Sequence, residues 1–107
     1  IFARWCGVLV AGDYISPVEI PMISNGGSLS AYRATLTRLR ELVADAQWVV
    51  PGHGEALDAQ RANAVIGEDL AYLDSLEQHG AGAQLPLARR TGEQKRIHAE
   101  NAARIAG

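Results

Sequence analysis

Two residues with side chains suited to binding a metal ion each follow an apolar segment and lie in a glycine-containing turn. Asp13 comes directly after Gly12, and His53 lies between Gly52 and Gly54. Carboxylate oxygen and imidazole nitrogen are both good ligands for Zn²⁺ and similar ions. Aspartate is also a common turn former, and a histidine between glycines is commonly a solvated loop residue. These two positions alone therefore leave metal binding and ordinary loop roles both open.

The segments that precede these turns have the composition of β-strands. The first, Trp5 to Ala11, is rich in valine, leucine and aromatic residues, and the second, Gln47 to Val50, is short and apolar. Apolar side chains fall on both faces of the first segment, which predicts a strand buried on both sides. Because ligands in α/β proteins gather where strands end, Asp13 and His53 are expected at the carboxyl edge of a sheet.

Three other segments have apolar residues at the three- and four-residue spacing of amphipathic helices. The first begins at Ser28 as N-cap and fades near Asp45, and the second begins at Asp58 and stops at Gly80. A third, weaker pattern extends over residues 93–105. The predicted order is strand, helix, strand, helix and a terminal helix, which is an α/β fold class.

Irregular segments separate these elements. A long connection from Tyr14 to Gly27 contains two prolines and a pair of glycines, and a second connection is expected between Gly80 and Thr91. Long loops in compact domains are often functional. The first loop follows Asp13 closely enough to line a pocket around it.

The run VLVAGDY, the helix after it and the run WVVPGHGEALD together resemble the carboxyl-terminal half of the metallo-β-lactamase superfamily. The resemblance extends over most of the chain and implies one half-domain, residues 1–107, of an αββα sandwich. It implies that Asp13 supplies a carboxylate bridging two metal ions, and that His53 supplies a ligand to one of them. Zinc is the implied cofactor and metal-assisted hydrolysis the implied reaction. A less specific similarity of residues 69–73 and 96–101 to hydrolase-like members favours ester or thioester substrates.

The same resemblance implies ligands that this chain does not carry. The family's amino-terminal half has a His-x-His-x-Asp-His motif and a further histidine, whereas the three histidines here, His53, His79 and His98, all follow Asp13. A catalytic zinc generally needs three protein ligands and an open position. The chain alone is therefore expected to have little or no hydrolase activity, and no residue is assigned as catalytic.

Two functions follow from these observations. The first is the distal half of a metallo-β-lactamase-fold hydrolase whose amino-terminal half is missing or supplied by another chain. The second is a non-enzymatic truncated remnant that acts as an oligomerisation or binding module. Half of a sandwich leaves an apolar sheet face uncovered, so a homo-oligomer or a missing amino-terminal half is the expected partner. The chain opens with Ile1 and its single methionine is Met22, so whether it is a fragment or a natural short protein stays open.

Four other residues have side chains that could take part in chemistry. His98 and Tyr14 are candidates to contact substrate or to support a metal ligand from behind, although a lone histidine on a polar helix is more often solvated. Cys6 is expected to be a small buried hydrophobe. His79, beside Gly80, is expected to interact with the end of a helix.

Composition excludes other classes of protein. Ten Lys plus Arg against twelve Asp plus Glu give a formal charge of −2, so a general nucleic-acid binder is not expected. No apolar run approaches the roughly 20 residues that span a bilayer, and a single cysteine fits a reducing compartment, so cytoplasm is the expected location. The basic residues near the carboxyl end are expected to form a solvated face; they are Arg89, Arg90, Lys95 and Arg96.

Overall fold

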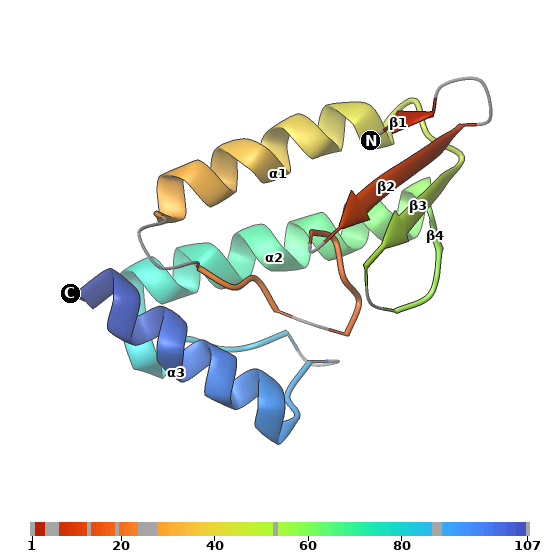
Figure 1. Ribbon diagram of the computed structural model, residues 1–107. Coiled ribbons are helices and arrows are strands. Elements are labelled where there is room, and N and C mark those ends of the chain that lie inside the picture. The colour runs from red at the N-terminus through yellow and green to blue at the C-terminus, as the bar shows by residue number, and fades with distance from the viewer. Residues whose placement is uncertain are drawn as a thin grey trace.

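Four short strands form one sheet, and helices pack against one of its faces (Figure 1). The computed structural model describes residues 2–3, 7–12, 14–18, 20–23, 28–52, 54–86 and 89–106. The two inner strands pair in parallel, and each outer strand pairs antiparallel to its neighbour. In sheet order the strands are β1 (Phe2–Ala3), β2 (Val8–Gly12), β3 (Trp48–Pro51) and β4 (Leu57–Asp58).

Three α-helices and one short 3₁₀ helix complete the described part of the chain. They are α1 (Leu29–Val43), α2 (Ala59–His79), η1 (Gly80–Gly82) and α3 (Gly92–Ala106). Helices α1 and α2 lie side by side against the sheet, and α3 packs against the carboxyl end of α2 (Figure 1). The mixed α/β class and the order of the larger elements match the sequence prediction. No helix in the described residues is long and apolar enough to cross a membrane.

Both helix starts predicted from the sequence are confirmed. The Ser28 hydroxyl accepts a hydrogen bond from the Ala31 backbone N–H at 3.1 Å, and the Asp58 carboxylate accepts one from Arg61 N–H at 2.7 Å. Each bond satisfies a backbone donor that the first helical turn leaves unpaired. At the other end of α2, Gly80 adopts a positive φ of 54° and stops the helix, as expected.

The core lies between α2, α1 and the covered face of the sheet. The apolar stripe of α2 is buried as predicted, except that Leu70 is only partly buried. Complete burial of a valine, leucine or isoleucine side chain contributes about 2 kcal/mol to the stability of the fold. This packing provides the rigid base from which the inner strands extend; its fully buried members include Leu9, Leu36, Val43, Val49, Ala62, Val65, Ile66, Leu73 and Leu76.

The prediction that the first strand is buried on both sides is wrong. Leu9 and Ala11 of β2 are buried, but Val10 between them is 46% exposed. The reason is that α1 and α2 pack on the same face of the sheet, and no described element covers the other. Trp5 and Cys6, which the prediction also included, lie outside the described residues. Strand β4 was not predicted, because two residues are too few to show a periodicity.

Candidate functional site

The parallel strands β2 and β3 end at the same edge of the sheet, where the residues preceding Asp13 and His53 are in contact. Gly12 is the register partner of Pro51, and the Gly52 backbone N–H donates to the Gly12 carbonyl at 2.5 Å. The two turns therefore begin side by side, as the sequence predicts. Asp13 and His53 themselves lie outside the described residues.

The residue that follows His53 is packed against the loop that follows Asp13. Gly54 adopts a φ of 97°, and a Cβ atom added there would lie 2.9 Å from Cγ of Pro17. A contact this close and a positive φ both require glycine. The described residues on both sides of the two predicted ligands thus belong to one compact corner of the molecule.

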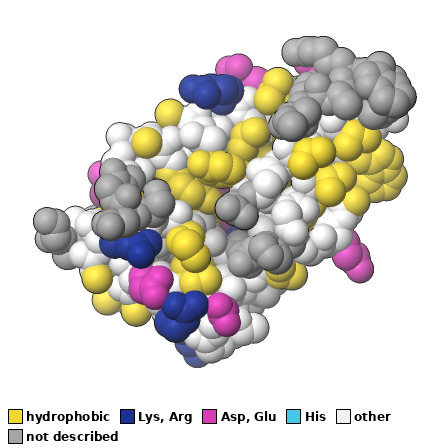
Figure 2. All heavy atoms as spheres, in the orientation of Figure 1, with side chains coloured by type: hydrophobic (Ala, Val, Ile, Leu, Met, Phe, Trp, Pro, Cys, Tyr) yellow, Lys and Arg dark blue, Asp and Glu magenta, His cyan; other side chains and the backbone are white. Residues whose placement is uncertain are grey.

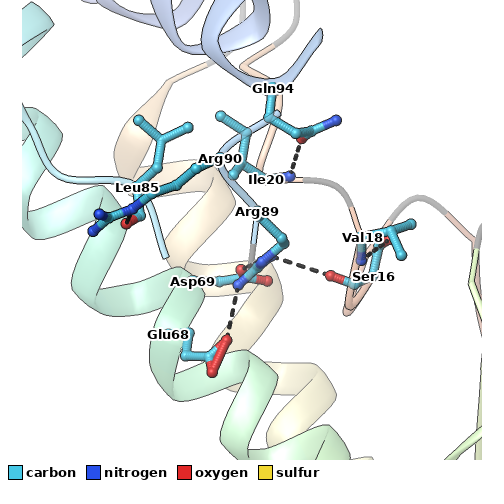
Figure 3. Close-up of polar contacts among 9 residues, drawn as sticks. All are labelled: Ser16, Val18, Ile20, Glu68, Asp69, Leu85, Arg89, Arg90 and Gln94. Atoms are coloured by element: carbon cyan, nitrogen blue, oxygen red, sulfur yellow. Dashed lines mark hydrogen bonds and ion pairs between the residues drawn. The ribbon is translucent and has the colours of Figure 1, made fainter. Parts of the chain in front are cut away.

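The β2–α1 loop, described over residues 14–18 and 20–23, is held in place by buried polar side chains. Arg89 is fully buried, and its Nη1 donates to the Ser16 carbonyl at 3.1 Å (Figure 3). Ile15, between Ser16 and the end of β2, is buried and adopts a φ of 59°. A β-branched residue in this conformation is strained by roughly 1–2 kcal/mol, so the surrounding contacts must fix it.

Arg89 is paired with two acidic side chains of α2. Its Nη1 lies 2.6 Å from Oδ1 of Asp69, and its Nη2 lies 3.3 Å from Oε1 of Glu68 (Figure 3). The Asp69 side chain is only 2% exposed. Burial raises the pKa of Asp69 to about 7, against the opposing attraction of Arg89. The expectation that Arg89 belongs to a solvated basic face is therefore wrong, because its partners lie twenty residues earlier in the chain.

The other basic residues of that predicted face do not act together either. Arg96 forms ion pairs along α3 with Glu93 at 3.0 Å and with Glu100 at 2.8 Å. Arg90 is exposed and donates from Nε to the Leu85 carbonyl at 3.0 Å. The four residues are thus divided between a buried ion pair, a helix surface and a loop.

Side chains of helix α3 form hydrogen bonds with the backbone of residues 20–23, the second part of the β2–α1 loop. Gln94 Oε1 accepts from Ile20 N–H at 2.6 Å, and Asn101 Oδ1 accepts from Ile23 N–H at 2.8 Å. Asn101 Nδ2 also donates to the Pro21 carbonyl at 2.7 Å. Buried backbone groups must be paired, and an irregular loop cannot pair them within itself. These amide side chains therefore supply the bonds that a neighbouring strand would otherwise provide.

His98, a candidate to contact substrate or to support a metal ligand from behind, lies inside this network. The residue is 7% exposed, with Nδ1 2.8 Å from the Tyr72 hydroxyl and Nε2 3.0 Å from the Ala81 carbonyl. The expectation of a solvated histidine is wrong because α3 turns this face toward α2 and η1. Burial raises the pKa of the Tyr72 hydroxyl, partly offset by a hydrogen bond from Asn101.

Tyr14, the other candidate, is half-buried directly after Asp13. Its ring centroid lies 5.0 Å from that of Tyr32 on α1, at an interplanar angle of 48°. This contact attaches the start of the loop to α1. His79 lies in the last turn of α2, at the helix end where it was expected, and its side chain is exposed.

The anchoring residues were missed from the sequence, although one signal was present. Gln94, His98 and Asn101 share the three- and four-residue spacing of Ile97, so four positions of one helical stripe face inward. Polar residues on a buried stripe indicate hydrogen-bond partners inside the protein. Asp69 and Arg89 had no comparable local signal, because their pairing depends on the tertiary fold.

Among the residues that the structure describes, no three His, Cys, Asp or Glu side chains lie together as a metal site. No protein-family model matches the chain, and no curated protein matches it significantly. Function is therefore inferred from the residues and their geometry.

Proposed function

We propose that this chain is the carboxyl-terminal half of a metal-dependent hydrolase of the metallo-β-lactamase type, with Asp13 and His53 as zinc ligands. The observation that supports it most is the contact between the two turns, from Gly52 N–H to the Gly12 carbonyl at 2.5 Å. Two ligands separated by forty positions can share one ion only if the fold brings their turns together. The close approach of Gly54, which follows His53, to the β2–α1 loop, which follows Asp13, supports the same conclusion.

The donor chemistry fits zinc in part. A carboxylate and an imidazole are ordinary zinc ligands, but a catalytic zinc generally has three protein ligands. The remaining ligands would come from an amino-terminal half, on the same polypeptide or on another. Bound zinc supplies a lowered pKa for a coordinated water and polarisation of an ester or thioester carbonyl. The role of this chain is to hold its two ligands rigidly, through the anchored β2–α1 loop and the inner strands β2 and β3.

The open face of the sheet supports the half-domain interpretation. Trp48 is 51% exposed and Val50 is 37% exposed, and Val50 is the register partner of the exposed Val10. Hydrophobic side chains gather on this face, over β2 and β3 (Figure 2). In an αββα sandwich a second sheet packs on such a face, so an amino-terminal half would cover it.

The experiment that tests the metal site is zinc titration of the purified chain by calorimetry. The native chain should bind zinc, and Asp13→Ala and His53→Ala should each weaken binding at least tenfold. His79→Ala and Asp45→Ala are matched controls, because both residues are exposed and lie at helix ends away from the turns. Zinc binding that is unaffected by the first two substitutions would overturn the assignment. Rapid zinc-dependent ester hydrolysis by this chain alone would overturn the half-enzyme part.

A second candidate function is a non-enzymatic oligomerisation or binding module. The exposed apolar strip of Val10, Trp48 and Val50 favours it, because such a strip on a small protein is an association surface. The two candidates differ in one measurement: a module of this kind associates through the sheet whether or not zinc is present, and its association is unchanged in Asp13→Ala.

A further inference from the structure

A groove of about 490 Å³ lies on the side of α2 that does not face the core. Its floor is a stripe of α2, and its wall is the segment after η1, described over residues 83–86 and 89–90. The residues that matter for its chemistry are Arg61, Glu68, Ala71, Leu85, Pro86 and Arg90.

The wall of the groove is fixed to α2 at both of its ends. At one end Gln84 N–H donates to the Ser75 hydroxyl at 3.2 Å, and at the other Arg89 pairs with Glu68 at 3.3 Å. The segment after η1 therefore runs antiparallel along α2, from Ser75 back toward the start of the helix. Arg61 lies two turns before Glu68 on the same stripe. From Arg61 to Ser75 the floor is therefore about 21 Å long, at 1.5 Å per residue.

Positive charge in the groove is not neutralised by the described part of the chain. Arg61 lines it from the floor and Arg90 from the wall, and neither forms an ion pair with a described residue. Arg90 donates from Nε to the Leu85 carbonyl (Figure 3), and its side chain lines the groove. The one carboxylate in the lining, Glu68, is paired with Arg89.

Apolar side chains line another part of the groove. Ala71 on the floor and Leu85 and Pro86 on the wall contribute side chains without polar atoms. Binding pockets for small molecules combine such apolar lining with a few placed polar groups that fix orientation. Guanidinium groups bind carboxylates with two parallel hydrogen bonds, which an ammonium cannot do.

We propose that this groove binds a small carboxylic acid with an aliphatic chain. The carboxylate lies at the guanidinium groups of Arg61 and Arg90, and the aliphatic chain lies against Ala71, Leu85 and Pro86. This binding site is separate from the two turns that carry Asp13 and His53, and it does not depend on zinc.

The test uses octanoate as the probe, titrated into ¹⁵N-labelled protein. Saturable shifts of amide signals from α2 and residues 84–86 are expected, and both Arg61→Gln and Arg90→Gln should weaken binding about tenfold. Arg38→Gln on α1 is the matched control, because Arg38 is exposed and does not line the groove. Arg90→Lys should give intermediate affinity. Failure of octanoate to saturate, or glutamine variants that both bind octanoate as tightly as the native chain, would overturn the proposal.

Two further ligands test the contributions of the carboxylate and of the aliphatic chain separately. Acetate has the carboxylate without the aliphatic chain, and octan-1-ol has the chain without the charge, so both should bind at least tenfold more weakly than octanoate. Ala71→Trp should fill the groove and abolish octanoate binding, whereas Ala34→Trp on the exposed surface of α1 should not. Octan-1-ol binding as tightly as octanoate would contradict the role of the arginines.

Discussion

The Tyr72 hydroxyl lies 2.8 Å from Nδ1 of His98, and this contact joins α2 to α3 inside the protein. The direction of the hydrogen bond follows from the other ring nitrogen. Nε2 faces the Ala81 carbonyl, which can only accept, so Nε2 carries the proton and Nδ1 accepts from Tyr72. Tyr72 in turn accepts from Asn101 Nδ2 at 3.1 Å, so one chain of bonds runs from α3 through α2 and back.

Removing the hydroxyl at the centre of this chain should destabilise the fold. Tyr72→Phe leaves Nδ1 of His98 and one N–H of Asn101 without their partner in a buried site, which costs about 1–3 kcal/mol. The free energy of unfolding in urea measures this. Tyr14→Phe is the control and should change the stability by less than about 0.5 kcal/mol. Equal stability of Tyr72→Phe and the native chain would contradict the assigned direction and importance of the bond.

Asn101 should control the order of the β2–α1 loop. Asn101→Leu removes the bonds to the Ile23 N–H, the Pro21 carbonyl and the Tyr72 hydroxyl while keeping the branched shape of the side chain. We expect a loss of about 2–4 kcal/mol in stability and much faster hydrogen exchange of the Ile23 amide. Asn63→Leu, on the exposed surface of α2, is the control. Unchanged exchange at Ile23 in Asn101→Leu would show that the loop is held by other contacts.

Local signals made the helices predictable from the sequence. Ser28 and Asp58 mark helix starts because the cap bond involves residues only three positions apart. Gly80 marks a helix end because few other residues adopt its positive φ. The meeting of the turns at Gly12 and Gly52 was also predictable, since parallel strands end at a common edge.

The one-sided burial of the sheet and the anchoring of the loop were not predictable in the same way. Val10 has the same residue type whether a helix or solvent covers it, and only the packing of both helices on one face decides its exposure. Arg89 is next to Arg90 in the sequence, which suggests a surface, while its partner Asp69 is on another element. His98 resembled a solvated residue because its partners, Tyr72 and Ala81, lie well before it in the chain.

The raised pKa of Asp69 predicts a specific dependence of stability on pH. An unfolded aspartate has a pKa near 3.8, whereas that of Asp69 in the fold is about 7. Between these values the unfolded chain releases a proton that the folded chain keeps, so stability from this group falls as pH rises from about 4 to 7. Asp69→Asn, which keeps an acceptor for Arg89, should flatten this part of the profile. The size of the effect is a few kcal/mol at most.

The measurement is urea unfolding of both proteins at several pH values from 4 to 8. Asp45→Asn, an exposed aspartate after α1, is the matched control and should leave the profile unchanged. A native profile that rises with pH over this interval, and becomes flat in Asp69→Asn, would mean that Arg89 outweighs burial and lowers the pKa of Asp69.

Gly54 should be the least replaceable of the described glycines near the site. Gly54→Ala places a methyl group within 2.9 Å of Pro17 and strains a φ of 97°, which should cost about 1–3 kcal/mol. Gly92→Ala is the control, because a Cβ there meets no atom within 4 Å and the residue begins a helix. Thermal unfolding compares the two. If zinc binds between the turns, Gly54→Ala should also weaken zinc binding, and Gly92→Ala should not.

The open face of the sheet should make the chain associate. Trp48 and Val50 side chains are exposed beside one another on β3, so a second copy or another chain can bury them. Sedimentation should show species larger than the 11.4 kDa monomer at micromolar concentration, and Trp48→Lys should return them to the monomer. Met22→Lys is the control, because Met22 is similarly exposed but lies in the loop rather than on the sheet. Because both lysines replace exposed side chains, the urea stability of the monomer should change little in either variant. A native chain that is only monomeric would count against self-association and would favour a different occupant of this face, such as an amino-terminal half.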